Sequence, residues 1–380
     1  MGEQEEFESW KRDCSEFRSD RPCAPSKLRG KVCGSCDEYV VGPASLCIVK
    51  LAAVGDVLRT TAFLPALRRL HPGHRILWLT QASAAPLLEG NPYIDELFTI
   101  EHGFPEALDR VAQDLVLCPD ADSKTAALAQ RIRLKEGGAR LGFFLSDRGL
   151  VEPLSDAARH WYLMGVSDEN KRANTQTYQD LVAATLELPV PHRDRPVLEL
   201  SEEEHSRASA WLSSVWSGSR DRLLGLNTGA GHRWPQKQWT LEGQVALIST
   251  LHEKGYTFVL LGGPAERDRH TALLSACPPG SCIDGGNDNT LRDFAARLAL
   301  CSLLVTGDTM ALHMATAFSM PVVALFGPTS LAEIELYDKG HKLQADELDC
   351  LCCYSRCDKH PDCMESIPVD RVLTAVLDLL

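Results

Sequence analysis

The sequence predicts an α/β protein built from two doubly wound, Rossmann-like domains that face each other across a cleft. At 380 residues the chain is longer than a single hydrophobic core usually serves. In each half, short apolar runs typical of buried strands alternate with segments of helical periodicity. The proline-rich stretch PVPHRDRPVL at residues 189–198 separates the two halves, so we expect the domain boundary near it.

The first half holds three predicted strand–helix units. Its first strand, in the run SLCIVKL, ends in the turn AAVGD, and Pro65 is expected to kink or break the helix that follows. A polar and then helical region at residues 150–185 is expected to connect the lobes or to form a lid. The strands and helices predicted for the three units are 45–51 with 57–70, 75–80 with 82–89, and 114–118 with 123–134.

The alternation restarts in the second half, with strands predicted at 222–227, 257–261, 303–306 and 322–326. Ligands of open α/β sheets bind beyond the carboxyl ends of the strands, so the turns at those ends are the places to look for a site. The C-terminal helix is expected to return to the first domain. We divide the chain into a cysteine-rich N-terminal extension (1–43), a first domain (44–195), a second domain (196–345) and a cysteine-rich tail with that helix (346–380).

The composition restricts the classes of partner. A formal net charge of −13 argues against nucleic acid, which proteins hold through clustered Lys and Arg. The first twenty residues are rich in charge and hold no apolar stretch of the kind a signal peptide needs, so we expect a cytoplasmic protein. Spanning helices are not predicted, although peripheral contact with the inner face of the membrane stays open.

The turn VGD places Asp56 at or near the start of a helix. An Asp in this position commonly caps the helix. It also lies at the carboxyl end of the first strand, where a carboxylate can deprotonate an acceptor hydroxyl. The residues alone leave both roles open.

The segment LNTGAGHRWPQKQW has the small residues and cations that a phosphate site requires. Backbone N–H groups of Thr228 and Gly229 and their neighbours can form a cradle, while Arg233 and Lys237 offset the charge of a diphosphate. Alternatively, these cations are solvated side chains that lie over neighbouring tryptophan rings.

Two further turns carry acidic residues. In TGDTMALH, Asp308 and Thr309 stand at a helix start with His313 one turn further on, an arrangement that suits an anionic donor with sugar hydroxyls. A capping Asp308 and a core His313 are the alternatives. In GGPAE, Glu266 stands where a ribose can be gripped.

Taken in order, these turns resemble those of glycosyltransferase family nine, the ADP-heptose heptosyltransferases. The similarity runs from about residue 45 to the C-terminus. It implies a GT-B fold, an acceptor-binding first domain, a nucleotide-sugar-binding second domain and an inverting transfer without a catalytic cofactor. The matching stretches are VKLAAVGDVLRTTAFLPALRRLHP, LLEGNPYIDEL, HRWPQKQW, LLGGPAE, TGDTMALHMATAFSMPVVALFGPTS and CDKHPDCMESIPVDRV.

The resemblance also implies roles for the site residues. Asp56 matches the general base, His232 or Arg233 the donor-phosphate contact, and Glu266 the ribose contact. Asp308 and His313 match contacts to the donor sugar and phosphate. The donor it implies is ADP-heptose, although another nucleotide sugar would fit the same turns. The sequence does not identify the acceptor: a lipid-linked core sugar, another glycan, a protein side chain and a small metabolite all stay open.

The chain departs from the family pattern at two places. Met310 follows Thr309 where the family usually has Gly, so the approach of the donor to the backbone is altered. The cation before the Trp-Pro pair is shared between His232 and Arg233.

Fourteen cysteines are many for a reducing compartment, where metal ligation is the commoner reason for clustering. One group lies in the N-terminal extension and another in the tail, and we expect a tetrahedral zinc site, or else an iron–sulfur cluster, to fasten the two ends together. Free thiols or air-formed disulfides are the alternative. The expected ligands are Cys33 and Cys36 from the extension with Cys350, Cys353, Cys357 and Cys363 from the tail.

Two other function classes compete with the transferase. A non-catalytic sensor of sugar nucleotides or metals is compatible with Met310 and the added cysteines. A nucleotide-dependent dehydrogenase is compatible only with the doubly wound fold, because no strand is followed by the G-x-G-x-x-G turn of dinucleotide sites.

Overall fold

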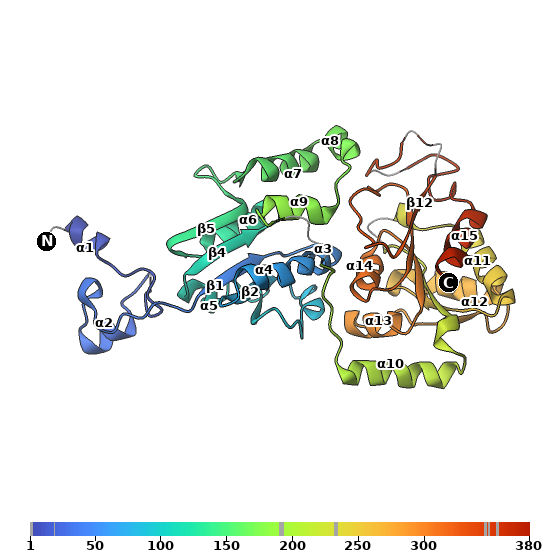
Figure 1. The fold of residues 1–380 in the computed structure, drawn as a ribbon, viewed down its shortest axis with the longest axis horizontal. Coiled ribbons are helices and arrows are strands. Elements are labelled where there is room, and N and C mark those ends of the chain that lie inside the picture. Colours follow the sequence, from blue (N-terminus) through green and yellow to red (C-terminus); the bar gives the residue numbers. More distant parts are fainter. Residues whose placement is uncertain are drawn as a thin grey trace.

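The chain folds into two α/β domains that lie side by side, each with one six-stranded sheet (Figure 1). The N-terminal extension projects from the outer end of the first domain, and the tail lies on the second domain. This computed structural model describes residues 3–18, 20–189, 194–231, 235–345, 348, 350–354 and 357–380.

The first sheet has the strand order β3-β2-β1-β4-β5-β6. Strands β1 to β5 are parallel, and only β6 runs antiparallel, to β5. All five side chains of β1 are buried, as expected of a central parallel strand with helices on both faces. The strands are β1 (Ser45–Val49), β2 (Arg75–Thr80), β3 (Glu96–Thr99), β4 (Gln113–Cys118), β5 (Leu134–Leu145) and β6 (Val151–Pro153).

The helix after β1 is interrupted at the predicted place. It divides into α3 (Val54–Thr60), a single 3₁₀ turn and α4 (Leu64–Leu70), with Pro65 in the first turn of α4. The helix predicted at 82–89 is wrong, because only the 3₁₀ turn η3 (Ala85–Leu87) forms there and Gly90 follows with a φ of 74°.

The other helices of this domain cover the sheet and approach the second domain. The pair α7 and α9 pack together on one side, and α8 joins them next to the second domain (Figure 1). They correspond to the region expected to connect the lobes or form a lid. These helices are α5 (Glu106–Arg110), α6 (Ser123–Arg131), α7 (Asp156–Val166), α8 (Asp168–Ala173) and α9 (Tyr178–Thr185).

The second sheet is parallel throughout, with the order β12-β11-β10-β7-β8-β9. Its four predicted strands are all present, and β9 and β12 extend the sheet at its two edges. The strands are β7 (Leu223–Asn227), β8 (Thr257–Leu261), β9 (Cys282–Asp284), β10 (Leu303–Gly307), β11 (Val322–Phe326) and β12 (Gly340–Gln344).

Helices cover both faces of this sheet and form two apolar clusters with it. The C-terminal helix α15 buries Val372, Ala375 and Val376 in one of them, against α11 and the sheet. It does not return to the first domain as expected, because its apolar face is already covered here. The helices are α10 (Glu202–Val215), α11 (Leu241–Glu253), α12 (Arg267–Ala276), α13 (Leu291–Leu298), α14 (Met310–Ala317) and α15 (Val369–Leu379), with the 3₁₀ turns η5 (Pro235–Lys237) and η6 (Pro264–Glu266).

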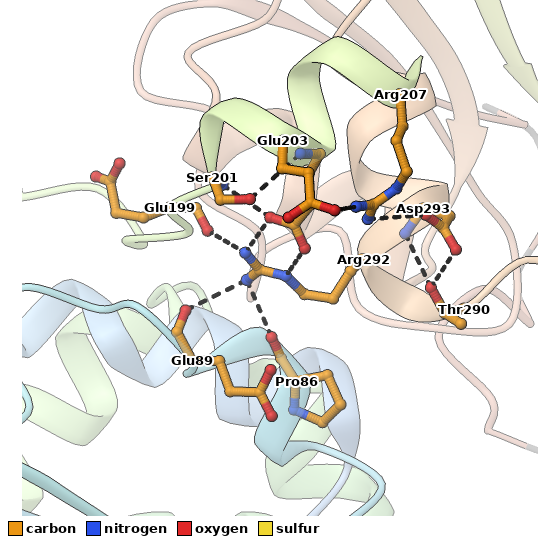
Figure 2. A network of polar contacts seen from close by, with 10 residues as sticks. Pro86, Glu89, Glu199, Ser201, Glu203, Arg207, Thr290, Arg292 and Asp293 are labelled. Carbon is orange, nitrogen blue, oxygen red and sulfur yellow. Dashed lines mark hydrogen bonds and ion pairs between the residues drawn. The ribbon is translucent and has the colours of Figure 1, made fainter. Parts of the chain in front are cut away.

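The guanidinium of Arg292 joins the two domains (Figure 2). From α13 it forms a bidentate pair with Glu204 of α10, and both side chains are largely buried. Its remaining N–H groups donate to the Glu199 carbonyl at 2.7 Å and to the Pro86 and Glu89 carbonyls of the first domain at 3.1 and 3.3 Å. An arginine has five N–H donors, so this side chain is fully used.

Removal of this guanidinium should destabilise the protein strongly. We expect Arg292→Met to lower the free energy of unfolding by about 3 kcal/mol, because Glu204 is left buried without its charge partner. Urea unfolding followed by circular dichroism measures the effect. The matched control is Arg207→Met, whose side chain is 52% exposed beside Glu203 and should contribute less than about 1 kcal/mol. Equal losses in the two variants would contradict the importance of the Arg292 contacts.

Candidate active site

A cavity of about 820 Å³ lies between the two domains at the carboxyl ends of the central strands. The first domain contributes the start of α3 and residues of α7, α8 and α9. The second domain contributes the start of α14, the loop after β11 and the tail. Five of the predicted site residues line this cavity: Asp56, Lys237, Asp308, Thr309 and His313.

Asp56 lies in the first turn of α3 and does not cap the helix. The N-cap is Ala53, and no side chain caps this end. The Asp56 carboxylate instead accepts hydrogen bonds from Arg59, with Nε at 3.0 Å and Nη2 at 2.8 Å from Oδ1. Its side chain keeps 35% of its surface exposed, so the carboxylate faces the cavity.

Two buried cations hold Asp56 in its ionised form. Burial by itself would raise its pKa, but Arg59 and Lys50 outweigh that effect and hold the pKa well below the usual range. Arg59 is fixed by the ring of Tyr178, whose centroid lies 3.5 Å from the guanidinium carbon. Lys50 is buried, pairs with Asp120 and donates to the Ala52 carbonyl in the turn before α3.

On the second domain, Asp308 pairs with Lys237 across two turns. Lys237 Nζ lies 2.8 Å from Asp308 Oδ2 and 3.0 Å from the Asp308 carbonyl oxygen. Burial opposes ionisation of Asp308, and the nearby ammonium keeps its pKa below the ordinary value. Asp308 does not cap α14, as the alternative interpretation had it. The N-cap residue is Thr309, and the Asp308 carboxylate pairs with Lys237 instead.

The start of α14 presents backbone donors to the cavity. Its N-cap is Thr309, whose side chain makes no capping hydrogen bond and instead contacts Asn227 and Thr306. The first N–H groups of this eight-residue helix are therefore not capped by a side chain. Together with the helix dipole, they make this end suitable for an anion.

His313 stands one turn into α14, between the two domains. Only 8% of it is exposed, and burial, reinforced by the nearby Arg59, lowers its pKa to about 4. It is therefore neutral near pH 7. The turn before α3 lies so close that a Cβ on Gly55 would stand 2.9 Å from His313 Cδ2. A glycine at position 55 allows this close contact.

The predicted phosphate cradle differs from expectation. The Thr228 N–H donates to the Leu261 carbonyl at 2.9 Å, as a continuation of the sheet, and its hydroxyl turns to the same oxygen. The Gly231 N–H donates to Glu266 at 3.0 Å. These two donors are thus engaged within the protein, while Gly229 approaches Glu266 too closely for a Cβ.

Glu266 holds two turns together in this structure. Its two carboxylate oxygens accept the N–H groups of Gly231 and Gly263, at 3.0 and 2.9 Å. Its expected contact with a ribose stays a prediction. His232 and Arg233, expected at the donor phosphate, lie outside the described residues.

The structure adds residues that the sequence analysis did not single out. Arg59 follows Asp56 by three positions, a spacing that brings side chains together on a helix, so this pair was detectable. Lys171 of α8 and Tyr354 of the tail were not, because their contact of 4.2 Å joins distant parts of the chain across the cavity. Half-buried Glu333, whose pKa is raised by burial, accepts a hydrogen bond from Tyr354.

The cysteines of the two chain ends do not meet. The extension with Cys33 and Cys36 lies at the outer end of the first domain, whereas Cys363 is buried in the second (Figure 1). The expected site shared by these with Cys350, Cys353 and Cys357 is therefore not formed. Within the described part of the chain, no three His, Cys, Asp or Glu side chains are already placed as metal ligands.

Comparison with known proteins identifies the family. The description "Glycosyltransferase family 9 (heptosyltransferase)" matches residues 107–363, which is more than half of the chain. The chain thus belongs to glycosyltransferase family 9, as its motifs indicated.

A curated relative, lipopolysaccharide heptosyltransferase 2 of Salmonella typhimurium, is 31% identical over 139 residues. This match covers 36% of the chain and only 38% of the relative.

In its described residues, the chain holds no helix that is both long and apolar enough to cross a bilayer.

Solved structures show the same fold over most of the chain. A family 9 glycosyltransferase from Veillonella parvula superposes with a TM-score of 0.69 at 21% identity, covering 88% of this chain and 97% of that one. ADP-heptose lipopolysaccharide heptosyltransferase II of E. coli gives 0.64 at 22% identity, with 88% and 98% covered. The expected GT-B fold of two Rossmann-like domains is confirmed.

The neutral state of His313 predicts a dependence of stability on pH. An unfolded histidine takes up its proton near pH ~6.5, whereas folded His313 does so only near pH 4. The stability associated with the neutral ring is present above pH ~6.5 and is lost as the pH falls towards 4, by roughly 3 kcal/mol in total. His313→Gln should remove this part of the slope.

Urea unfolding of wild type and variant at several pH values between 7 and 4 measures the difference. His102→Gln, in an exposed turn, is the control and should follow the wild type. Parallel pH profiles of wild type and His313→Gln would show that His313 is not held neutral.

Proposed function

We propose that the chain is an inverting, metal-independent glycosyltransferase that moves heptose from ADP-heptose to a hydroxyl of a lipopolysaccharide precursor. The observation that carries the proposal is the opposition of two groups across one cavity. Asp56 faces it from the first domain, and the uncapped start of α14 with the Lys237–Asp308 pair faces it from the second. Donor and acceptor follow the names of the relatives, which are heptosyltransferases of lipopolysaccharide.

The reaction follows from this opposition. The acceptor hydroxyl binds between Asp56 and the anomeric carbon of the donor, and Asp56 removes its proton as the oxygen attacks. The new glycosidic bond forms on the face opposite the diphosphate, whose bond to the anomeric carbon breaks, so the configuration inverts. General base catalysis by such a carboxylate contributes about 10²- to 10⁴-fold.

The leaving diphosphate requires positive charge and hydrogen-bond donors. The start of α14 offers backbone N–H groups and the positive end of the helix dipole, and Lys237 lies beside it. Arg233 is a further candidate from the predicted motif. No metal ion is needed for the charge compensation that these groups provide.

Binding of the donor would also make Asp56 a better base. In the structure the cations around it hold its pKa low. A diphosphate brings negative charge into the same cavity and so raises the pKa of Asp56 towards its ordinary value. The base is then stronger when the donor is present.

The acceptor side has the apolar surface expected for a lipid-linked substrate. Leu150 and Leu154 near β6, and Leu163 and Val166 of α7, are between 44% and 65% exposed. On the same helix α7, Trp161, Met164 and Gly165 line the cavity. This supports peripheral contact with the inner face of a membrane, on the cytoplasmic side, as part of the proposal.

The non-catalytic alternative is less well supported. It rested on Met310 and on the added cysteines. Met310 lines the cavity but leaves Asp56, Asp308 and His313 gathered around the same space. A sensor that had lost its chemistry would not require two ionised carboxylates and a neutral imidazole around one cavity.

Asp56→Asn tests the base. Loss of the ionised carboxylate should lower kcat about 10²- to 10⁴-fold, while ADP binding is kept or becomes tighter because one negative charge has left the cavity. Transfer from ADP-heptose and isothermal titration with ADP provide the two readouts. Asp156→Asn, at a side chain that is 94% exposed, is the control. Wild-type turnover in Asp56→Asn would refute the assignment.

Lys237→Met tests the donor side. Loss of a charged hydrogen-bonding partner near the diphosphate should weaken ADP binding about tenfold to a hundredfold. The variant also leaves Asp308 without its ion pair, so Lys237→Arg is needed to separate charge from packing, and it should recover part of the affinity. Lys254→Met at the end of α11 is the control. Unchanged ADP affinity in Lys237→Met would place the diphosphate elsewhere.

A further inference from the structure

The N-terminal extension has almost no apolar core. Within its described part, residues 3–18 and 20–43, the buried residues are Cys14, Pro25 and Gly42. Its large apolar side chains are instead exposed by 40% to 75%: Phe7, Trp10, Leu28, Val32, Val40 and Val41. A segment of this size cannot be stabilised by so little burial and needs a cross-link or a metal.

All four cysteines of the extension line one small cavity. They are Cys14, Cys23, Cys33 and Cys36, and none is in a disulfide. The cavity measures about 20 Å³, which is room for a water-sized body and too little for an organic ligand. Cys14, Cys23 and Cys36 each lie close enough to Cys33 to interact with it electrostatically.

The thiols come from three separate local structures. Cys14 lies in an isolated bridge with Val41, and Cys23 is the N-cap residue of α2 (Ala24–Arg29). Cys33 and Cys36 bracket the 3₁₀ turn η1 (Cys33–Ser35), in which the Cys36 N–H donates to the Cys33 carbonyl at 3.3 Å. One ion bound by all four would join these three structures.

An N–H donor and charged side chains stand around the cavity. The backbone N–H of Lys11 donates to Cys33 Sγ at 3.3 Å, a bond that stabilises negative charge on sulfur. The side chains of Lys11 and Lys31 line the same cavity. Glu16 and Glu38 line it as well, and Lys31 pairs with Asp37 at 2.8 Å.

We propose that Cys14, Cys23, Cys33 and Cys36 form a structural zinc site that belongs to the extension alone. Four thiolates in tetrahedral arrangement are a preferred set for Zn²⁺, and Cys-x₂-Cys in a tight turn is a typical half of such a site. The four described thiols are not placed as ligands of one ion in the structure, so binding requires their side chains to move together. Binding releases the protons of those thiols that are not already ionised.

The proposal does not depend on the transferase function. The extension contacts the first domain through Arg133, which donates to the Arg12 carbonyl at 3.1 Å and lies over the ring of Phe17, far from the cavity between the domains. Loss of the metal should therefore loosen the extension and leave ADP binding unchanged. This separates a failure of the zinc site from a failure of the proposed activity.

The test uses the full chain, purified anaerobically with reductant, and elemental analysis of wild type and two variants. Cys33→Ser with Cys36→Ser should lower the zinc content by about one equivalent per chain. Cys357→Ser, in the tail, is the matched control and should keep that equivalent. Equal zinc in wild type and the double variant, or iron in place of zinc, would overturn the proposal.

A second measurement covers the case in which the double variant loses the fold of the extension. Titration of chelator-treated wild type with Co²⁺ should give the absorption bands of a tetrahedral tetrathiolate, and these should be absent from Cys14→Ser. Limited proteolysis should cut chelator-treated wild type first within residues 1–43, and added Zn²⁺ should restore resistance. Disulfides among the four cysteines under the anaerobic conditions, with no cobalt bands, would contradict the site.

Discussion

The close contact between Gly55 and His313 determines how the rest of the site is arranged. It brings the turn before α3 against α14, so the carboxylate of one domain and the helix start of the other open onto the same space. Any larger residue at position 55 would push these two elements apart or displace the imidazole. The contact of Gly55 with His313 thus sets how far apart the two domains hold their cavity-lining groups.

The charges that line the cavity are balanced within the protein itself. Lys50, Arg59 and Lys237 each pair with a carboxylate, and the Arg59 pair is held further by the ring of Tyr178. Buried charges are costly when single and tolerable when paired with good geometry. The pairs therefore keep an ionised cavity stable before any substrate enters, and the incoming diphosphate changes a balance that is already set.

What could be predicted from the sequence was local in origin. The central strands follow from apolar runs, the break after α3 from Pro65, and the position of Asp56 from the turn after β1. The contacts of Lys50 with Asp120 and of Lys171 with Tyr354 depend on the packing of distant segments, which no spacing reveals. The same limit explains two wrong predictions. The C-terminal helix was expected on the first domain but packs on the second, and the cysteines of the extension and the tail were expected to meet but lie at opposite ends of the molecule.

Saturation of the Arg292 guanidinium restricts how the two domains move. Since every donor is engaged, sliding of one domain over the other would break several hydrogen bonds at once, whereas a rotation centred on this side chain would preserve them. Further contacts join α8 and α9 to the second domain: the Tyr178 N–H donates to the Glu333 carbonyl at 3.0 Å, the Gln179 amide donates to the Tyr337 hydroxyl at 3.0 Å, and Lys171 lies over the ring of Tyr354. Arg292 thus limits the relative movements of the two domains to those that keep its hydrogen bonds together.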